Sequence, residues 1–323
     1  MMTLLFPGQG SQQPGMGRFL FDNFKVAKET FEEASEALSQ DMKKLCFEGS
    51  EADLALTENT QPALLLVSTA TQRVLKSEYH IKASAGAGHS IGEYAALVAA
   101  NVIDFTPAMK AVRARGQAMQ SAVPVGQGGM IATLGLEPDQ AQFLCEYVVK
   151  NSSAGPLSPA NFNSPGQIVL SGSMKAIEWL KANFKPEIFP EPPRRAKLIP
   201  LNVSAPFHCE MMLPAEKKMR EVLTAMEFRA PAFKIVQNFT ANFESTPEKL
   251  RENLIRQVSA PVRWTESMEL LKAQNLTKCV ECGAGKVVAG LLKKIDSEAF
   301  TVFNTNTLED LKLIEDFLKA SSH

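Results

Sequence analysis

A short segment flanked by glycines holds the serine best suited to covalent chemistry. Gly88, Ser90 and Gly92 form a G-x-S-x-G pattern that follows an expected strand and opens an expected helix. In such a strand-to-helix turn the serine hydroxyl is accessible, and the two glycines let neighbouring backbone approach without a clash. The free N–H groups and positive dipole end of the helix would face an oxyanion formed beside Ser90. The pattern therefore predicts Ser90 as a nucleophile.

The same residues also permit a purely structural interpretation. Ser90 and Glu93 have the S-x-x-E spacing of a capping box, in which the two side chains bind N–H groups at the start of a helix. A cap does not require both Gly88 and Gly92. The glycine pair therefore favours the nucleophile over the cap.

A serine nucleophile needs a general base, and the chain has four histidines. His89 adjoins the serine in a sharp turn, so its side chain would point away from the Ser90 hydroxyl. His80 precedes the strand that leads to this turn, and His323 is terminal. His208 remains, in a loop-like segment, and elimination predicts it as the base. The alternative is a histidine with only a structural role in that loop.

The order of expected elements indicates an α/β protein with a mainly parallel sheet, because short apolar runs alternate with amphipathic stretches. Strands are expected at 3–6, 83–87, 234–237, 278–281 and 300–304. Helices are expected at 25–39, 61–78, 91–100, 106–122, 215–226, 247–258, 286–295 and 308–319.

The middle of the chain has a different order, which predicts an inserted subdomain. Its elements are a strand at 130–136, a helix at 138–149, strands at 160–163 and 167–171, a helix at 175–183 and a strand at 196–201. This βαββαβ order is the ferredoxin-like arrangement. We therefore expect a larger domain formed by residues 1–127 and 202–323, a smaller subdomain at 128–201, and a ligand cleft between them.

Composition and charge disfavour several classes of protein. The 323 residues are 45% hydrophobic and 21% charged, as in ordinary globular proteins. The formal net charge of -1 offers no general attraction for nucleic acid or for an anionic membrane. No export signal or membrane span is recognisable, and the five scattered cysteines fit a reducing compartment better than a disulfide framework. We therefore expect a cytoplasmic protein without a metal site.

A second glycine-rich segment follows the first expected strand. Gly8, Gln9 and Gly10 lack the Walker lysine and the third Rossmann glycine, so nucleotide binding is disfavoured. A loop that donates backbone N–H groups is the better interpretation.

Seven motifs in order along the chain give it a family resemblance. They are PGQGSQ at 7–12, TQPAL at 60–64, GHSIGE at 88–93, RG at 115–116, NSPGQ at 163–167, VSAPFH at 203–208, and Gln257 followed by PVRW at 261–264. The set covers nearly the whole chain and resembles the malonyl-CoA:acyl carrier protein transacylases. A single motif such as G-x-S-x-G is unspecific, whereas the combination is highly specific.

The resemblance implies an α/β-hydrolase-like larger domain and a ping-pong transfer of malonyl from malonyl-CoA to the phosphopantetheine thiol of acyl carrier protein, in fatty acid synthesis. By similarity, Ser90 would attack the thioester and His208 would be its base. Gln257 would orient the histidine in place of a triad acid. The backbone N–H groups of Gln9 and Ile91 would hold the oxyanion.

Arg115 matches the family's carboxylate clamp, and a planar guanidinium suits two parallel hydrogen bonds to a carboxylate. Arg113 is the alternative cation. The sequence departs from the family at two positions: Ala284 replaces a proline, and Phe207 stands where many stand-alone bacterial members have serine. Phenylalanine there resembles malonyl-selective acyltransferases of polyketide synthases.

We expect no bound cofactor, since phosphopantetheine arrives on the carrier protein, and we expect a monomer. Arg194, Arg195 and Lys197 form a local basic stretch that could dock an acidic carrier protein; a solvated surface run is the alternative. Three other functions stay open: a trans-acting acyltransferase of a polyketide synthase, a serine thioesterase or esterase, and a non-catalytic α/β binding module.

Overall fold

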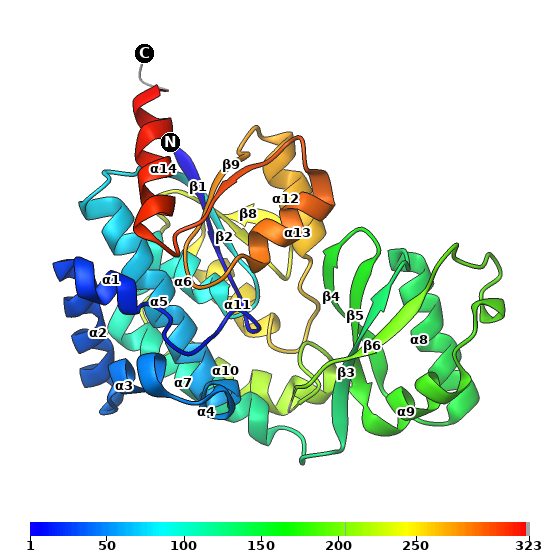
Figure 1. Ribbon diagram of the computed structural model, residues 1–323. Coiled ribbons are helices and arrows are strands. Elements are labelled where there is room, and N and C mark those ends of the chain that lie inside the picture. The colour runs from blue at the N-terminus through cyan, green and yellow to red at the C-terminus, as the bar shows by residue number, and fades with distance from the viewer. Residues whose placement is uncertain (204, 321–323) are drawn as a thin grey trace.

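The chain forms a larger and a smaller part, each built on its own sheet (Figure 1). The computed structural model describes residues 1–203 and 205–320. The larger sheet has six strands, in spatial order β10 (Thr301–Phe303), β9 (Lys278–Glu281), β1 (Met2–Phe6), β2 (Ala83–Gly88), β7 (Lys234–Gln237) and β8 (Asn242–Glu244). All neighbouring strands are parallel except β7 and β8. The expected α/β class with a mainly parallel sheet is confirmed.

Helices surround this larger sheet. In chain order they are α1 (Arg18–Asn23), α2 (Lys25–Leu38), α3 (Met42–Glu48), α4 (Glu51–Ala55), α5 (Thr57–Ser77), α6 (Gly92–Ala99), α7 (Phe105–Ser121), α10 (Leu213–Thr224), α11 (Pro247–Arg256), α12 (Trp264–Ala273), α13 (Val287–Asp296) and α14 (Leu308–Ala320). Within the described residues, no helix is both long enough and apolar enough to cross a membrane.

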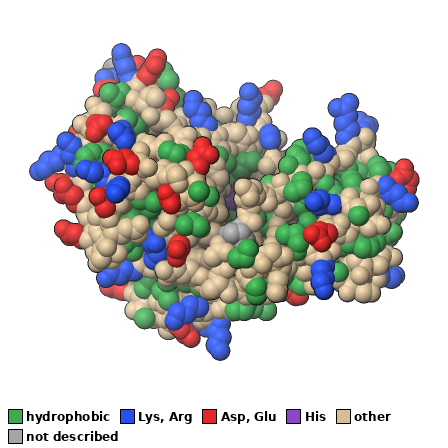
Figure 2. Space-filling view, turned by 60° about the horizontal axis from the view of Figure 1, so that its bottom comes forward, with side chains coloured by type: hydrophobic (Ala, Val, Ile, Leu, Met, Phe, Trp, Pro, Cys, Tyr) green, Lys and Arg blue, Asp and Glu red, His purple; other side chains and the backbone are tan. Residues whose placement is uncertain are grey.

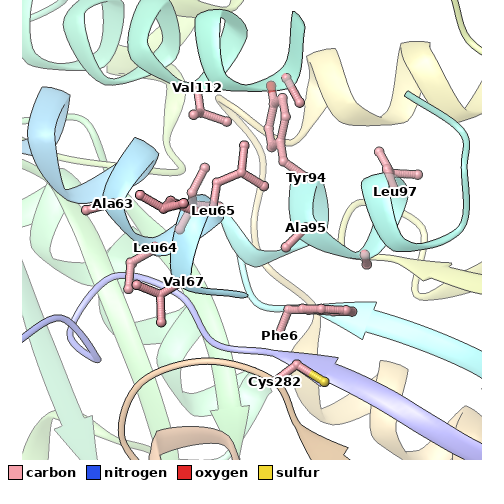
Figure 3. Packing of buried hydrophobic residues seen from close by; sticks show 14 of the residues in the cluster. Phe6, Ala63, Leu64, Leu65, Val67, Tyr94, Ala95, Leu97, Val112 and Cys282 are labelled. Atoms are coloured by element: carbon pink, nitrogen blue, oxygen red, sulfur yellow. The ribbon is translucent and has the colours of Figure 1, made fainter. Parts of the chain in front are cut away.

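The side chains of β1 alternate between two hydrophobic clusters, as the period of a strand requires. Leu4 and Phe6 belong to the cluster beneath α5, α6 and α7, part of which Figure 3 shows. Leu5 belongs to the opposite cluster, with Trp264 of α12 and Val288 of α13. Both faces of the central strand are therefore covered, which explains its uninterrupted apolar sequence.

The smaller part is an antiparallel sheet with two helices. Its elements follow the expected order: β3 (Gly128–Leu134), α8 (Pro138–Ser152), β4 (Leu157–Ser164), β5 (Gln167–Ser173), α9 (Met174–Asn183) and β6 (Lys197–Pro200). The strands lie in spatial order β4-β5-β3-β6. This part has a separate hydrophobic core between the sheet and both helices, with Ile131, Leu144, Leu170 and Leu180 at its centre.

Backbone hydrogen bonds join the two parts. The Phe162 N–H donates to the Val262 carbonyl at 2.9 Å, and the Val262 N–H donates to the Ala160 carbonyl at 2.8 Å. Figure 2 shows a hollow between the parts, with a histidine side chain inside it.

Several elements differ from the sequence expectations. The short elements α1, α3, α4 and β8 were not expected, because so few residues show no clear period. Helix α12 was also missed, although its buried residues Trp264, Met268 and Leu271 have helical spacing. Helix α5 begins at Thr57 rather than at residue 61, so Pro62 lies inside the helix. Two short 3-10 helices, Pro186–Ile188 and Glu210–Met212, complete the secondary structure.

We expect Gly92→Ala to destabilise the fold. An added Cβ would lie 2.3 Å from the Phe6 carbonyl oxygen, so α6 would have to move away from the end of β1. Overpacking of this kind costs about 1–3 kcal/mol of the free energy of unfolding. The matched control is Gly290→Ala in α13, where a Cβ meets nothing within 4 Å; it should stabilise by about 0.5–1 kcal/mol. Equal stability of Gly92→Ala and wild type in denaturant unfolding would contradict this packing.

Candidate active site

Ser90 occupies a strained turn between β2 and α6. Its φ is 53°, in the left-handed region that residues other than glycine seldom adopt. The turn is tight, because a Cβ at Gly88 would lie 2.0 Å from the carbonyl carbon of Gly92. The helix cap is Ile91, without a side-chain cap hydrogen bond. The capping-box interpretation of Ser90 and Glu93 is therefore wrong. Gly88 and Gly92 are required for steric reasons, because neighbouring backbone leaves no room for a Cβ at either position.

His208 lies beside the serine. Its Nε2 is 2.8 Å from Ser90 Oγ, and its Nδ1 is 2.8 Å from the main-chain oxygen of Gln257. Because a carbonyl oxygen can only accept, Nδ1 carries the proton and Nε2 is left to accept from the serine hydroxyl. Burial, followed by the positive charge of Arg115, lowers the pKa of His208 to about 3. The imidazole is therefore neutral at neutral pH and able to take a proton.

The other histidines lie elsewhere. His89 Nε2 is 2.7 Å from Asn163 Oδ1, so this side chain points away from the serine hydroxyl, as the turn predicted. His80 is exposed and lines a separate cavity of about 370 Å³, which contains no nucleophile paired with a base. His323 lies outside the described residues.

Gln257 follows α11 and connects the other site residues. Its main-chain oxygen holds His208, so it contacts the histidine through the backbone rather than through its amide. Its side-chain Nε2 donates to the Ser90 carbonyl at 3.0 Å. Its Oε1 accepts from Arg115 Nη2 at 2.9 Å. A single residue thus contacts the serine, the histidine and the arginine.

Arg115 of α7 brings a buried positive charge to the serine. Its side chain is buried, with Nη1 donating to Gln61 Oε1 at 2.9 Å and Nη2 donating to Ser90 Oγ at 3.3 Å. Its hydrogen-bond partners are two glutamine amides and the serine hydroxyl, and none of them is a carboxylate. Arg113 instead donates to Asn59 Oδ1 at 3.1 Å, away from the serine. Of these two arginines, the one beside Ser90 is therefore Arg115.

The carboxyl ends of β1 and β2 bring both glycine-rich segments together, because Phe6 pairs with Gly88. Gln9 and Ile91 consequently line the same cavity of about 160 Å³ as Ser90. Within the described part of the chain, the N–H groups of Gln9 and Ile91 have no hydrogen-bond acceptor. They are free to donate to a ligand oxygen beside the serine.

The remaining surface of this cavity is largely apolar. It includes Met119, Met130, Val169, Leu201 and Phe207. Across residues 1–203 and 205–320, no cluster of three His, Cys, Asp or Glu side chains could hold a metal ion.

The basic stretch lies at the edge of the smaller part. Arg194, Arg195 and Lys197 are exposed, just before and at the start of edge strand β6. The chain then continues to Leu201 and Val203, which line the cavity.

Three polar residues of the site were missed as functional groups. Gln61 binds Arg115, and its only sequence signal is its place in the TQPAL motif. Asn238 accepts the Ser90 N–H at 2.7 Å; polar residues after parallel strands are candidates for such roles, and Asn238 directly follows β7. The S-x-x-E spacing indicates only a capping role for Glu93, whereas the structure places its carboxyl group against Asn238 and Gln257.

The fold and site define an α/β protein with a serine–histidine pair for nucleophilic chemistry. The family model for the acyl transferase domain matches residues 3–292. A malonyl CoA-acyl carrier protein transacylase of Bacillus subtilis is 40% identical over 93% of this chain and 92% of its own. This chain belongs to the acyl transferase domain family and is an acyltransferase.

Solved structures agree with this assignment. An acyl carrier protein S-malonyltransferase from Vibrio cholerae has a TM-score of 0.89 and 40% identity, over 97% of this chain and 99% of its own. A malonyl-transacylase in complex with a type II PKS acyl-carrier protein has a TM-score of 0.89 and 39% identity, over 98% of this chain and 99% of its own.

Proposed function

We propose that this enzyme transfers the malonyl group of malonyl-CoA to the phosphopantetheine thiol of an acyl carrier protein, supplying fatty acid chain elongation. The observation that carries the proposal is a buried arginine whose hydrogen-bond partners among the described residues include no carboxylate, and which lies 3.3 Å from the hydroxyl of a serine paired with a neutral histidine. A serine–histidine pair suits acyl transfer. The added cation suits an acyl group that ends in a carboxylate.

The first half-reaction forms a seryl ester. Ser90 Oγ attacks the thioester carbonyl carbon while His208 Nε2 takes the hydroxyl proton, and the N–H groups of Gln9 and Ile91 hold the oxyanion. The intermediate collapses, the carbon–sulfur bond breaks, and the coenzyme A thiolate takes the proton from His208. The Gln257 carbonyl accepts from Nδ1 throughout and therefore supports the imidazolium while it exists.

The second half-reaction reverses these steps with a different thiol. The phosphopantetheine thiol gives its proton to His208 and attacks the ester carbonyl carbon. Collapse of this intermediate releases Ser90, which regains the proton from His208. Every group in the cycle belongs to this chain or its two substrates, so the proposal includes no bound cofactor.

We propose that the chain has two domains, one of which carries the serine and histidine of this reaction. The larger domain, formed by residues 1–127 and 202–323, is the α/β-hydrolase-like catalytic domain. This assignment is supported by the turn that holds Ser90, which follows the parallel strand β2. Residues 128–201 form a ferredoxin-like subdomain, supported by the βαββαβ order and the antiparallel strand order β4-β5-β3-β6. The substrate cavity lies between the two, with residues from both in its lining.

We further propose that the enzyme works as a monomer in the cytoplasm. The Ser90 site is complete within one chain, and all five cysteines are free and buried, as suits a reducing compartment. A net charge of -1 gives no reason to expect a nucleic-acid or membrane partner.

A second candidate function is that of a trans-acting acyltransferase, which charges the carrier protein of a polyketide synthase. Two observations favour it as an alternative: the match to a malonyl-transacylase in complex with a type II PKS acyl-carrier protein, and Phe207 in the cavity lining. Comparing the rates at which fatty acid and polyketide carriers are charged would separate the two.

We expect malonyl-CoA to acylate Ser90. Intact mass after mixing should show a malonyl adduct on the wild type and none on Ser90→Ala. Adding a carrier protein should move the group to its thiol, whereas a thioesterase would release free malonate. An adduct that persists in Ser90→Ala would show that the nucleophile is wrongly assigned.

We expect Arg115→Ala to lose its preference for malonyl-CoA over acetyl-CoA. Only malonyl offers a carboxylate to the guanidinium, and a lost buried charged pair costs about 2–5 kcal/mol. The readout is the ratio of malonyl to acetyl transfer, because Arg115 also contacts Ser90 and Gln257. Arg113→Ala is the matched control and should keep the wild-type ratio. An unchanged ratio in Arg115→Ala would assign the carboxylate to another group.

We expect charge reversal of Arg194 and Arg195, which together with Lys197 form the proposed docking stretch, to weaken use of the carrier. Exposed rim charges act mainly on association and its salt dependence. The double reversal should raise the KM for the carrier and flatten its salt dependence, while acylation by malonyl-CoA stays unchanged. Reversal of Lys43 and Lys44, exposed on α3, is the control. An unaltered carrier KM at low salt would reject this docking surface.

A further inference from the structure

Glu93 is a buried carboxyl group that the mechanism above does not use. It lies on α6 and is 0% exposed. Its Oε2 accepts from the Asn238 main-chain N–H at 2.7 Å and from Gln257 Nε2 at 3.0 Å, and its Oε1 accepts from Gln237 Nε2 at 3.0 Å. All three partners are donors. A carboxylate can accept all three hydrogen bonds. A protonated carboxyl group carries an O–H donor, which has no acceptor among these three N–H groups.

The donor groups around Glu93 cannot easily turn round to suit a protonated carboxyl. The Asn238 donor is a main-chain N–H, which has no other orientation. The Gln237 amide is fixed by two further contacts: its Nε2 donates to the Leu250 carbonyl at 2.9 Å, and its Oε1 accepts from Asn253 Nδ2 at 2.8 Å. The surroundings are therefore built for the ionised carboxylate.

Two of these partners hold the reacting groups. Asn238 Oδ1 accepts the Ser90 N–H at 2.7 Å, and its Nδ2 donates to the Gly88 carbonyl at 2.8 Å. Gln257 accepts from His208 Nδ1 through its main-chain oxygen at 2.8 Å. Glu93 is thus the common acceptor for the residue that fixes the serine turn and the residue that orients the histidine.

We propose that Glu93 is a positioning residue for acyl transfer, whose carboxylate holds Asn238 and Gln257 in the places where they orient Ser90 and His208. The inference rests on the proposed function, because it concerns the same serine reaction. Glu93 contacts His208 only through Gln257. Glu93 binds the side-chain amide of Gln257, whereas His208 is bound by the main-chain oxygen of Gln257, so Glu93 acts on the histidine by placing Gln257 and not as the acid of a Ser-His-Asp triad.

Ionisation of Glu93 gives this role a distinctive pH dependence. Burial raises the pKa of Glu93 to about 7, against the opposing effects of its three hydrogen bonds and the charge of Arg115 on α7. The neighbouring Tyr94 has a pKa that burial raises, and His208, beyond Gln257, has a pKa lowered to about 3. Near neutral pH, Glu93 is therefore the member of this network that changes charge.

The sign of the effect on rate differs from that on stability. Below its pKa, Glu93 is protonated and loses acceptor capacity, so acylation should slow as the pH falls through about 7. Because the folded pKa is raised, the same protonation favours the folded state, and the stability from this group is lost only as the pH rises. Slower acylation at acid pH therefore does not reflect unfolding caused by Glu93.

The test measures single-turnover release of coenzyme A from malonyl-CoA across pH, in the wild type and in Glu93→Gln. In the wild type, the acylation rate should fall as the pH drops below the Glu93 pKa of about 7; we call this fall the acid limb of the pH profile. Glu93→Gln should lower the maximal acylation rate by about 100-fold through misplaced reacting groups, with a smaller change in KM. It should also lack the acid limb, because an amide does not titrate.

Two further variants separate positioning from structure. Gln237→Met keeps the carboxyl group but removes one donor, which raises the pKa of Glu93 and should move the acid limb to higher pH. Glu281→Gln is the matched control, because Glu281 is equally buried, has a pKa raised by burial to about 7, and accepts from the N–H groups of Val288 and Ala289. It should keep both the acylation rate and the acid limb of the wild type.

Several outcomes would overturn the inference. They are a wild-type acylation rate in folded Glu93→Gln, an acid limb that persists in this variant, and an unmoved limb in Gln237→Met. If Glu93→Gln does not fold, the pH profile of Gln237→Met decides: an acid limb at higher pH supports the inference, and any other result overturns it. A wild type that is not acylated at all would instead reject the proposed function, so the two failures are distinguishable.

Discussion

The hydrogen bond from His208 Nδ1 to the Gln257 main-chain oxygen is the interaction on which the rest of the site depends. It fixes the tautomer, so that Nε2 faces Ser90 Oγ as an acceptor. A carbonyl carries no full charge, and burial beside Arg115 disfavours the imidazolium further. The outcome is an imidazole that is neutral at neutral pH and placed to accept the Ser90 proton, as the proposed mechanism requires.

Two ionisable side chains, Arg115 and Glu93, are buried next to this hydrogen bond and both contact Gln257. Among residues 1–203 and 205–320, Arg115 has no carboxylate hydrogen-bond partner, so its guanidinium would be able to bind the carboxylate of the proposed substrate. Glu93 is the nearby carboxyl group, and its hydrogen-bond donors are uncharged groups rather than the arginine. A buried pair kept apart in this way costs stability. Under the proposed function this separation keeps Arg115 available, because a direct ion pair with Glu93 would occupy the guanidinium that is proposed to bind the substrate carboxylate.

The serine turn and the choice of histidine could be predicted from the sequence, because both depend on local sequence patterns. The spacing of Gly88, Ser90 and Gly92 predicts the turn, because neighbouring backbone leaves no room for a side chain at either glycine, and four histidines leave few choices of base. The partners of the site could not be predicted in the same way. Asn238 and Glu93 lie 145 positions apart and meet only because β2 and β7 are neighbours, and Gln257 acts on His208 through a main-chain atom that every residue has. Helix α12 differs from these contacts, because the helical spacing of Trp264, Met268 and Leu271 is already present in the sequence.

The protonation state of His208 is the most direct test of this account, and NMR titration of its labelled ring nitrogens measures it. We expect a neutral ring with the proton on Nδ1 at neutral pH, and no titration until the pH approaches the lowered pKa of about 3. The chemical shifts should also show hydrogen bonds at both nitrogens. A His208 that titrates near the ordinary histidine pKa of about 6.5, or that carries its proton on Nε2, would contradict the account.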